Sequence, residues 1–343
     1  MKMLPAAVTT VGVVAAAVLI APTVATAQPA DAGATNVSSN LVPVSDSGRG
    51  TTRMVTPDTA SAIITAYWTP QRLAAAIPLD MAPATASRSQ SGSAAKPATK
   101  PAGTPSVVAA PAAPVPGAIR PAVNFTNAEG KVFFHNPATG GDYSCSGGTV
   151  NSGKRRLVLT AGHCVHGGSG QQWMTNWVFY PGYQFGAGWA GAFPAYQLWA
   201  KTAWINNSNV SYDYAFAITQ NGPSGTTIVD TVGGNGLIVN PGRPFVTAIA
   251  YPGNFNNGEQ QAYCQGTLSA RSIFNSDQQL NCDLRFGASG GPWMENYSDS
   301  TLLGYTVSNQ SYSLNSDGSG PEYGPYYDSD TTSLYNAAET ASP

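Results

Sequence analysis

The sequence predicts an all-β domain of the antiparallel barrel or sandwich class, occupying residues 121–343 of the 343-residue chain. After residue 121, short runs rich in β-branched and aromatic residues alternate with Gly, Asn, Asp and Pro, and no long run has the 3.6-residue period of a helix. Many short strands over about 220 residues are typical of antiparallel barrels and sandwiches. The predicted strands include Val132–Phe134, Leu157–Thr160, Trp177–Tyr180, Tyr214–Ile218, Phe245–Tyr251 and Leu302–Val307. The one expected helix is short and carboxyl-terminal, over Ser333–Thr340, with Thr331 and Thr332 as caps.

The first 27 residues have the pattern of a secretory signal peptide. Lys2 precedes an apolar run from about Ala6 to Ala21, and Ala25-Thr26-Ala27 supplies the small residues of a cleavage site. A membrane anchor is the alternative, but the run is short and lacks a basic stop-transfer flank. We therefore expect a secreted, extracellular protein with no membrane association after signal cleavage.

Two further segments are expected before the domain. Residues 28–80 form a propeptide whose main apolar stretch, Ala60–Leu79, has the spacing of an amphipathic helix. Residues 81–120 are dominated by Ala, Pro, Ser, Thr and Gly, and such a segment cannot bury enough apolar surface to offset its ordering entropy. We expect it to be a disordered linker or a further part of the propeptide.

Charge separates these segments from the domain. Residues 1–120 carry eight Lys and Arg against four Asp and Glu, whereas residues 121–343 carry eight against fourteen. A cationic pro-segment lying on an anionic domain is the hypothesis that follows. Only 10% of the residues are charged and no basic block or stripe is present, so nucleic acid is excluded as a partner.

The four cysteines are expected to form two disulfides, because the protein is exported. Four cysteines allow three pairings, and nearness in sequence favours Cys145 with Cys164 and Cys264 with Cys282. A zinc site is the competing interpretation, but no C-x-x-C pair exists. We expect no metal and no cofactor.

Gly287-Ala288-Ser289-Gly290-Gly291-Pro292 indicates a nucleophilic serine. The flanking glycines lack Cβ atoms, which lets a substrate carbonyl approach, and the N–H groups of Gly287 and Ser289 are candidates for an oxyanion hole. The motif also matches the nucleophile elbow of α/β-hydrolases, in which the histidine follows the serine. All three histidines of this chain precede Ser289, which argues against that class.

His163 is the candidate base, at the end of Leu157-Val158-Leu159-Thr160-Ala161-Gly162-His163-Cys164. This segment resembles the histidine motif of chymotrypsin-like (trypsin-superfamily) serine proteases, and Cys145-Ser146-Gly147-Gly148 resembles the strand that carries the partner cysteine there. With the serine motif, the resemblance covers about residues 125–340 in the family's order. It is strongest to the secreted bacterial trypsin-like and glutamyl-endopeptidase-like branch.

A carboxylate must hold the histidine in the correct tautomer. The family order places it between histidine and serine, where Asp213, Asp230, Asp277 and Asp283 stand. Asp213 is preferred because an apolar strand follows it, as in the family. A subtilisin order using Asp142 would require βα alternation, which is absent from the sequence pattern. His135 and His166 are expected at the surface.

The resemblance implies two six-stranded antiparallel β-barrels with a short carboxyl-terminal helix, and a serine endopeptidase that acts on proteins or peptides as a monomer. Hydrolysis would proceed through an acyl-enzyme formed by His163, Asp213 and Ser289. Ala288 departs from the family, because digestive members carry there an Asp that pairs with the freed amino terminus. Activation is therefore expected to use other contacts. The alternatives are a catalytically inactive binding module and an esterase with the same triad.

Substrate choice is expected to depend on the segment before Ser289 and on the strand from Tyr305 to Gln310. Asp283 stands six residues before Ser289, the spacing of the pocket-floor Asp in trypsin-like members, although Arg285 is near enough in sequence to neutralise it. Thr306 and Ser308 are expected to line the pocket. Related enzymes that prefer Glu carry a histidine in this strand, which the chain lacks, but the two hydroxyls can still bond a carboxylate, so a Glu preference is weakened and not removed. Ser308 is also the expected donor to Asp213.

Overall fold

A computed structural model describes residues 36–45, 52–53, 55–79, 104–113, 126–186, 188–272 and 275–343. The predicted signal peptide and most of the segment over residues 81–120 lie outside these ranges. In the described part of the chain, no helix is both long and apolar enough to cross a membrane.

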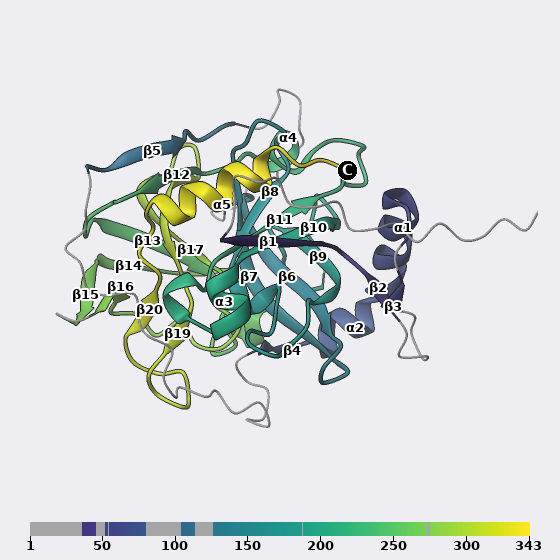
Figure 1. Ribbon diagram of the computed structural model, residues 1–343, viewed down its shortest axis with the longest axis horizontal. Helices are drawn as coiled ribbons and strands as arrows, with labels where there is room; N and C mark the ends of the chain where they lie inside the picture. Colours follow the sequence, from purple (N-terminus) through teal and green to yellow (C-terminus); the bar gives the residue numbers. More distant parts are fainter. Residues whose placement is uncertain are drawn as a thin grey trace, which may run out of the picture. The chain divides into compact units, whose positions relative to one another are not determined.

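The first half of the domain is a closed six-stranded barrel (Figure 1). The barrel runs in the order β9-β6-β7-β8-β11-β10, and an additional pairing of β10 with β9 closes it. All six pairings are antiparallel. The strands are β6 (Glu129–Asn136), β7 (Gly141–Val150), β8 (Leu157–Thr160), β9 (Thr175–Pro181), β10 (Phe193–Lys201) and β11 (Ala215–Thr219).

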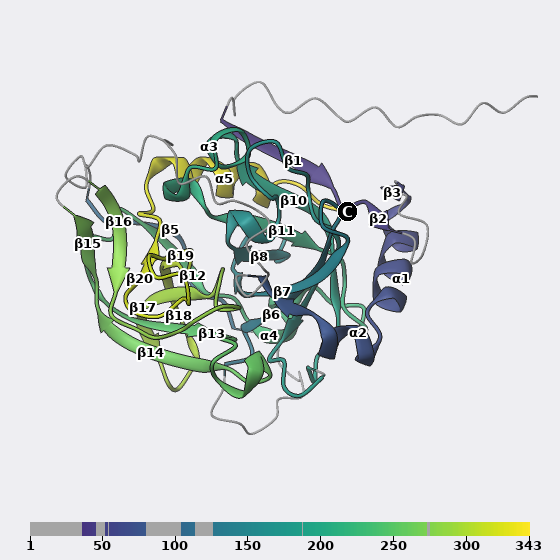
Figure 2. The same ribbon diagram turned by 90° about the horizontal axis from the view of Figure 1, so that it is seen from below.

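The second half has two sheets, visible in Figure 2 as mainly green and yellow strands beside the teal barrel, with the edge strand β5 in blue. The larger sheet has the order β14-β13-β17-β18-β12-β5 and the smaller β15-β16-β20-β19. Pairing is antiparallel except between β12 and β18, which run parallel. The bounds are β5 (Ser106–Ala109), β12 (Gly236–Val239), β13 (Phe245–Ala250), β14 (Ala262–Thr267), β15 (Ser269–Ser272), β16 (Asn275–Leu280), β17 (Pro292–Ser298), β18 (Leu303–Asn309), β19 (Tyr312–Ser313) and β20 (Glu322–Gly324).

These sheets confirm the predicted double-barrel class, and each predicted apolar run contributes a strand. Three clusters of buried side chains form the core. One fills the first barrel, one lies within the second half, and the third joins the first barrel to the carboxyl-terminal helix. The buried residues are consistent with strands whose inward-facing side chains fill the barrel interiors.

The short helical elements lie between strands and at the carboxyl end. They are α3 (Thr202–Asn207), α4 (Ile228–Val232), α5 (Ser329–Glu339) and the 3₁₀ turns η2 (Gly162–Cys164), η3 (Val210–Tyr212) and η4 (Asn256–Gly258). The expected terminal helix is present but begins earlier, because Asp328 caps it. Its side chain accepts from the Asp330 N–H at 2.9 Å, and Thr331 closes a reciprocal capping box.

The amino-terminal segment packs on the first barrel. It contains β1 (Val37–Leu41), β2 (Val44–Ser45), β3 (Thr52–Arg53), α1 (Pro57–Tyr67), α2 (Pro70–Ala75) and β4 (Ile77–Pro78). The single helix expected over Ala60–Leu79 is two helices, because Pro70 starts a new helix whose N-cap is Thr69. β1 pairs with β10 over five residues, and α1 lies beside the barrel in both views (Figures 1 and 2).

The described part of the Ala/Pro-rich segment differs from an extended linker. Ser106–Ala109 form the strand β5, which pairs antiparallel with β12 at the edge of the larger sheet. The composition of this stretch gives no indication of a strand. Its backbone hydrogen bonds are supplied by the unpaired edge of β12.

Candidate active site

Ser289 lies in a tight turn that is bonded to the first barrel. Gly287 and Gly290 on either side have φ values of +90° and +84°, a region that non-glycine residues rarely adopt. A β-carbon at Gly290 would lie 2.2 Å from Thr160 Oγ1, so no side chain fits there. The Ser146 N–H donates to the Ser289 carbonyl at 2.8 Å, and this bond fixes the turn against β7.

His163 lies in η2, directly after β8 ends. Two hydrogen bonds of 2.7 Å hold it, one from its backbone N–H to Asp213 Oδ1 and one between its ring Nδ1 and Asp213 Oδ2. The side chains of His163 and Asp213 are 12% and 2% exposed, so water competes little for this contact. The carboxylate orients the imidazole with Nε2 directed away from Asp213.

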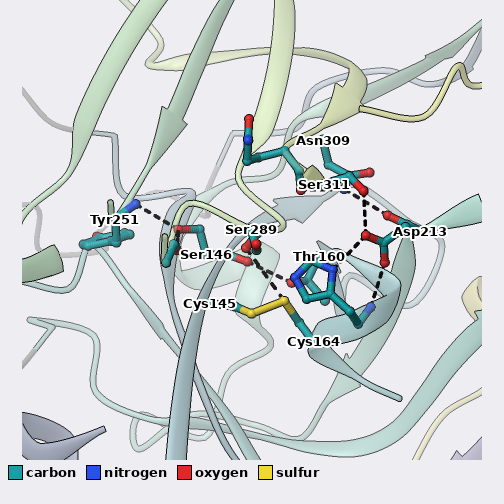
Figure 3. The surroundings of a disulfide bond; sticks show 12 residues. Cys145, Ser146, Thr160, Cys164, Asp213, Tyr251, Ser289, Asn309 and Ser311 are labelled. Atoms are coloured by element: carbon teal, nitrogen blue, oxygen red, sulfur yellow. Dashed lines mark hydrogen bonds and ion pairs between the residues drawn. A yellow bond between two sulfur atoms is a disulfide. The ribbon is translucent and has the colours of Figure 1, made fainter. Parts of the chain in front are cut away.

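The Asp213 carboxylate receives a third bond, from the Ser311 hydroxyl at 2.6 Å (Figure 3). Its backbone carbonyl accepts from Asn309 Nδ2 at 3.2 Å, and Asn309 in turn accepts from the Tyr327 hydroxyl at 2.8 Å. A buried ionised carboxylate requires such donors to offset its desolvation. Asp213 is therefore fixed by residues from both halves of the domain.

The Cys145–Cys164 disulfide lies against both the turn that contains Ser289 and the ring of His163. Cys164 Sγ lies 3.8 Å from the Ser289 carbonyl oxygen, and Figure 3 shows Ser289 next to the disulfide. The ring nitrogen of His163 lies within 4.8 Å of both sulfur atoms. This cluster is not a metal site, because both sulfurs are bonded to each other. Cys264 is paired with Cys282, so both expected disulfides are present.

Gly287 is oriented by its carbonyl group. The carbonyl accepts from Ser146 Oγ at 2.8 Å, and Ser146 Oγ accepts from the Tyr251 N–H, also at 2.8 Å. Within the described residues, no acceptor takes the Gly287 N–H. This amide is available to a ligand next to Ser289, which is the arrangement required of an oxyanion-hole donor.

The structure places Asp283, which was expected at the floor of a specificity pocket, at the surface. Asp283 is 53% exposed and forms two bonds with Arg285, Nε to Oδ1 at 2.7 Å and Nη2 to Oδ2 at 3.2 Å. It is therefore not a buried pocket floor with a free charge. Thr306 and Ser308 are fully buried on β18.

Ser308 does not donate to Asp213, contrary to expectation. Its hydroxyl donates to the Pro325 carbonyl at 2.9 Å, and Ser311 takes the expected role. Sequence reasoning missed Ser311, Asn309 and Tyr327. The polar run Ser308-Asn309-Gln310-Ser311 offers two serines three residues apart, and the β17–β18 register shifts twice in this hairpin. No signal in the sequence fixes which serine faces Asp213.

The other two histidines are not surface residues. His166 is 4% exposed, its Nδ1 accepts from the Gly168 N–H at 3.1 Å, and burial lowers its pKa to about 4. His135 is half-buried and bonds to Asp142 and Tyr67. Asp142, the alternative triad acid, is bonded to His135 and not to His163.

Two solved structures are similar to the chain along nearly their whole length. A thermostable serine protease AL20 from an extremophilic microorganism is 33% identical, with a TM-score of 0.58 over 63% of this chain and 99% of that one. The protease Anisep from Arthrobacter nicotinovorans is 35% identical, with a TM-score of 0.58 over 64% and 98%. A Glu endopeptidase, 17% identical with a TM-score of 0.50 over 68% and 98%, shares the fold. No family model and no curated protein sequence matches the chain.

The double-barrel fold and these similarities define the class of protein, a serine endopeptidase and therefore a hydrolase of protein or peptide substrates. More particularly, the chain belongs to the chymotrypsin-like (trypsin-superfamily) serine proteases of bacteria.

Proposed function

We propose that the protein is a secreted endopeptidase in which Ser289 is the nucleophile, His163 the general base and Asp213 the residue that orients and stabilises the histidine. The observation that carries this proposal is the pair of 2.7 Å bonds between His163 and a buried Asp213, beside the disulfide that also contacts the Ser289 turn. Two disulfides are consistent with export to an oxidising compartment.

In the proposed mechanism, His163 removes the hydroxyl proton of Ser289 as the oxygen attacks the scissile carbonyl. The oxyanion accepts hydrogen bonds from the N–H groups of Gly287 and Ser289. His163 then protonates the leaving amine, and an acyl-enzyme remains on Ser289. Water, deprotonated by His163, releases the acid product and regenerates the serine. No metal or cofactor takes part in these steps.

The specificity proposal follows from Asp283. Because Arg285 already neutralises this carboxylate at the surface, we propose that Asp283 does not select Arg or Lys at the P1 position. A panel of peptides that differ only at P1 tests this. A strong preference for Arg and Lys that disappears in Asp283→Asn would contradict it.

Hydrolysis of an internally quenched peptide by purified protein, after limited proteolysis of the amino-terminal segment, tests the triad. We expect Ser289→Ala and His163→Ala each to lower kcat by several orders of magnitude, and Asp213→Asn by about 10⁴, with far-UV circular dichroism unchanged. Full activity in Ser289→Ala refutes the assignment. Ester hydrolysis without peptide cleavage would identify an esterase.

A further inference from the structure

The short strand β4 lies on the edge of β7 that also holds Ser289. Ile77 pairs with Tyr143 and Pro78 with Ser144, in parallel orientation. Further along the same edge of β7, β8 pairs with Gly148–Val150. Between the stretch that pairs with β4 and the stretch that pairs with β8, the Ser146 N–H donates to the Ser289 carbonyl. Residues 144 and 146 face the same edge, and two residues of a strand span about 6.6 Å. β4 therefore ends two residues along this edge from the point where the turn that contains Ser289 is bonded.

Pro78 covers the face of Gly287 that the missing side chain leaves open. A β-carbon at Gly287 would lie 3.1 Å from the Cβ of Pro78 and 2.9 Å from the Tyr251 carbonyl oxygen. The N–H of Gly287 is the proposed oxyanion donor. Pro78 therefore packs directly against the turn that holds the proposed oxyanion donor and nucleophile.

An open strand edge beside a nucleophile is a natural binding surface for an extended peptide, since main-chain hydrogen bonds to the edge supply affinity without dependence on sequence. We expect a substrate whose scissile carbonyl is at Ser289 to run along this edge, past Ser144. β4 takes this edge and runs in the same direction as β7. A substrate and β4 cannot use these backbone groups together.

The helices before β4 anchor it to the barrel. Ile64, Trp68 and Leu73 are at most 3% exposed and belong to the same core cluster as the barrel interior. Trp68 Nε1 donates to the Asn176 carbonyl at 2.6 Å. Burial of this apolar surface holds α1 on β9 and β10, and so determines where the chain that follows it, including β4, must lie.

A polar cluster at Asp142 adds a second anchor, one residue before the β4 pairing begins. Arg72 Nη1 bonds to Asp142 Oδ2 at 2.7 Å and the Tyr67 hydroxyl donates to Oδ1 at 2.6 Å. His135 Nδ1 lies 2.9 Å from the same Oδ1. Burial alone would raise the pKa of Asp142, but these hydrogen bonds and the Arg72 charge hold it below its usual value. Asp142 thus binds the pro-segment as a carboxylate.

We propose that Ile77–Pro78 is an inhibitory strand, which blocks substrate from the β7 edge and from Gly287 until the anchoring segment over residues 55–79 leaves the barrel. The inference rests on the proposed function, because it takes Ser289 as the nucleophile. The propeptide would then inhibit through one defined contact, that of Ile77–Pro78 with β7 and Gly287. It also supplies a control of activity that does not need the ion pair lost at Ala288.

The test compares four full-length proteins: the unaltered chain, Arg72→Ala, Pro78→Gly and Gln71→Ala. Gln71 is an exposed neighbour of Arg72 in α2 and serves as the matched control. The rate of covalent labelling by a fluorophosphonate is measured before any proteolysis. We expect both Arg72→Ala and Pro78→Gly to label faster than the other two proteins, with Arg72→Ala about two- to fivefold faster, the factor for loss of a partly exposed ion pair.

A second readout does not depend on catalysis. In full-length protein carrying Ser289→Ala, amide hydrogen exchange at Ser144 is compared with and without Pro78→Gly, and we expect faster exchange when Pro78 is replaced. Equal labelling rates in all four proteins, or equal exchange in the two, overturns the inhibitory strand. Labelling that persists in Ser289→Ala instead refutes the proposed nucleophile, and the exchange comparison still decides the strand.

Discussion

Replacing Ser311 by Ala tests the hydrogen-bonded support of Asp213. The Ser311 hydroxyl donates to Asp213 Oδ2 at 2.6 Å, and both residues are at most 2% exposed, so water cannot replace the lost donor. A hydrogen bond to a charged group contributes about 1.5–3 kcal/mol. Asp213 keeps its two bonds from His163, so the geometry is weakened and not abolished.

If the lost stabilisation is expressed in the transition state, kcat falls by about one to two orders of magnitude, since each 1.36 kcal/mol is a factor of ten. KM should change little, because Ser311 acts on the histidine through Asp213. The assay is steady-state hydrolysis of a quenched peptide by the processed enzyme. Thermal unfolding of the same samples measures any loss of stability.

The matched control is Ser308→Ala, which removes a buried hydroxyl that donates to the Pro325 carbonyl. It should cost about 0.5–1.5 kcal/mol of stability and leave kcat nearly unchanged. The reasoning is refuted if Ser308→Ala lowers kcat as much as Ser311→Ala, or if the Ser311 variant keeps full kcat.

Three further predictions concern stability. Replacing both cysteines of either disulfide by Ala, Cys145 with Cys164 or Cys264 with Cys282, should lower the free energy of unfolding by about 3 kcal/mol, because the sequence separations are 19 and 18. Only loss of Cys145–Cys164 should also lower kcat, because this disulfide lies next to His163. Burial raises the pKa of Glu129 from its usual 4.5 to about 7. As the pH rises from 4.5 to 7, Glu129 therefore ionises in the unfolded state before it does so in the folded state, and the free energy of unfolding should fall by about 3 kcal/mol. Glu129→Gln should remove this fall. Trp68→Ala should lower the stability of the full-length chain by about 3–5 kcal/mol, because Trp68 is 3% exposed in the core.

Each of these is measured by chemical or thermal unfolding. Equal loss of kcat from both disulfide deletions would contradict the specific role of Cys145–Cys164. For Glu129, the informative quantity is the difference between wild type and Glu129→Gln, because His166 has a lowered pKa and gives the opposite pH dependence. An unchanged pH profile in Glu129→Gln contradicts the prediction. For Trp68, the control is Tyr263→Ala, which alters a side chain that is 71% exposed.

The sequence predicted the fold class because its strands carry local signals. Leu157–Thr160 is a strand with the predicted bounds, and the other apolar runs differ from their strands by a few residues. The order of His163, Asp213 and Ser289 could be inferred because motif order along the chain is visible without coordinates. Their contacts could not, since they depend on how the two halves pack.

The remaining features depend on tertiary context. The Ser311 to Asp213 bond requires the path of the chain after β18, which two register shifts alter. β5 forms in an Ala/Pro-rich stretch only because β12 offers an open edge. β4 has two residues, and its significance comes from its partner strand and from Gly287. The exposure of Asp283 could not be predicted from the sequence either, although Arg285, two residues later, indicated that its charge would be paired.

The central claim is that Ser289 is the nucleophile of a peptidase. The most direct measurement is mass spectrometry of the processed protein after reaction with a fluorophosphonate. We expect a single adduct on the peptide that contains Ser289, with no adduct in Ser289→Ala and a much slower reaction in His163→Ala. An adduct on another residue, or none on correctly folded processed protein, would contradict it.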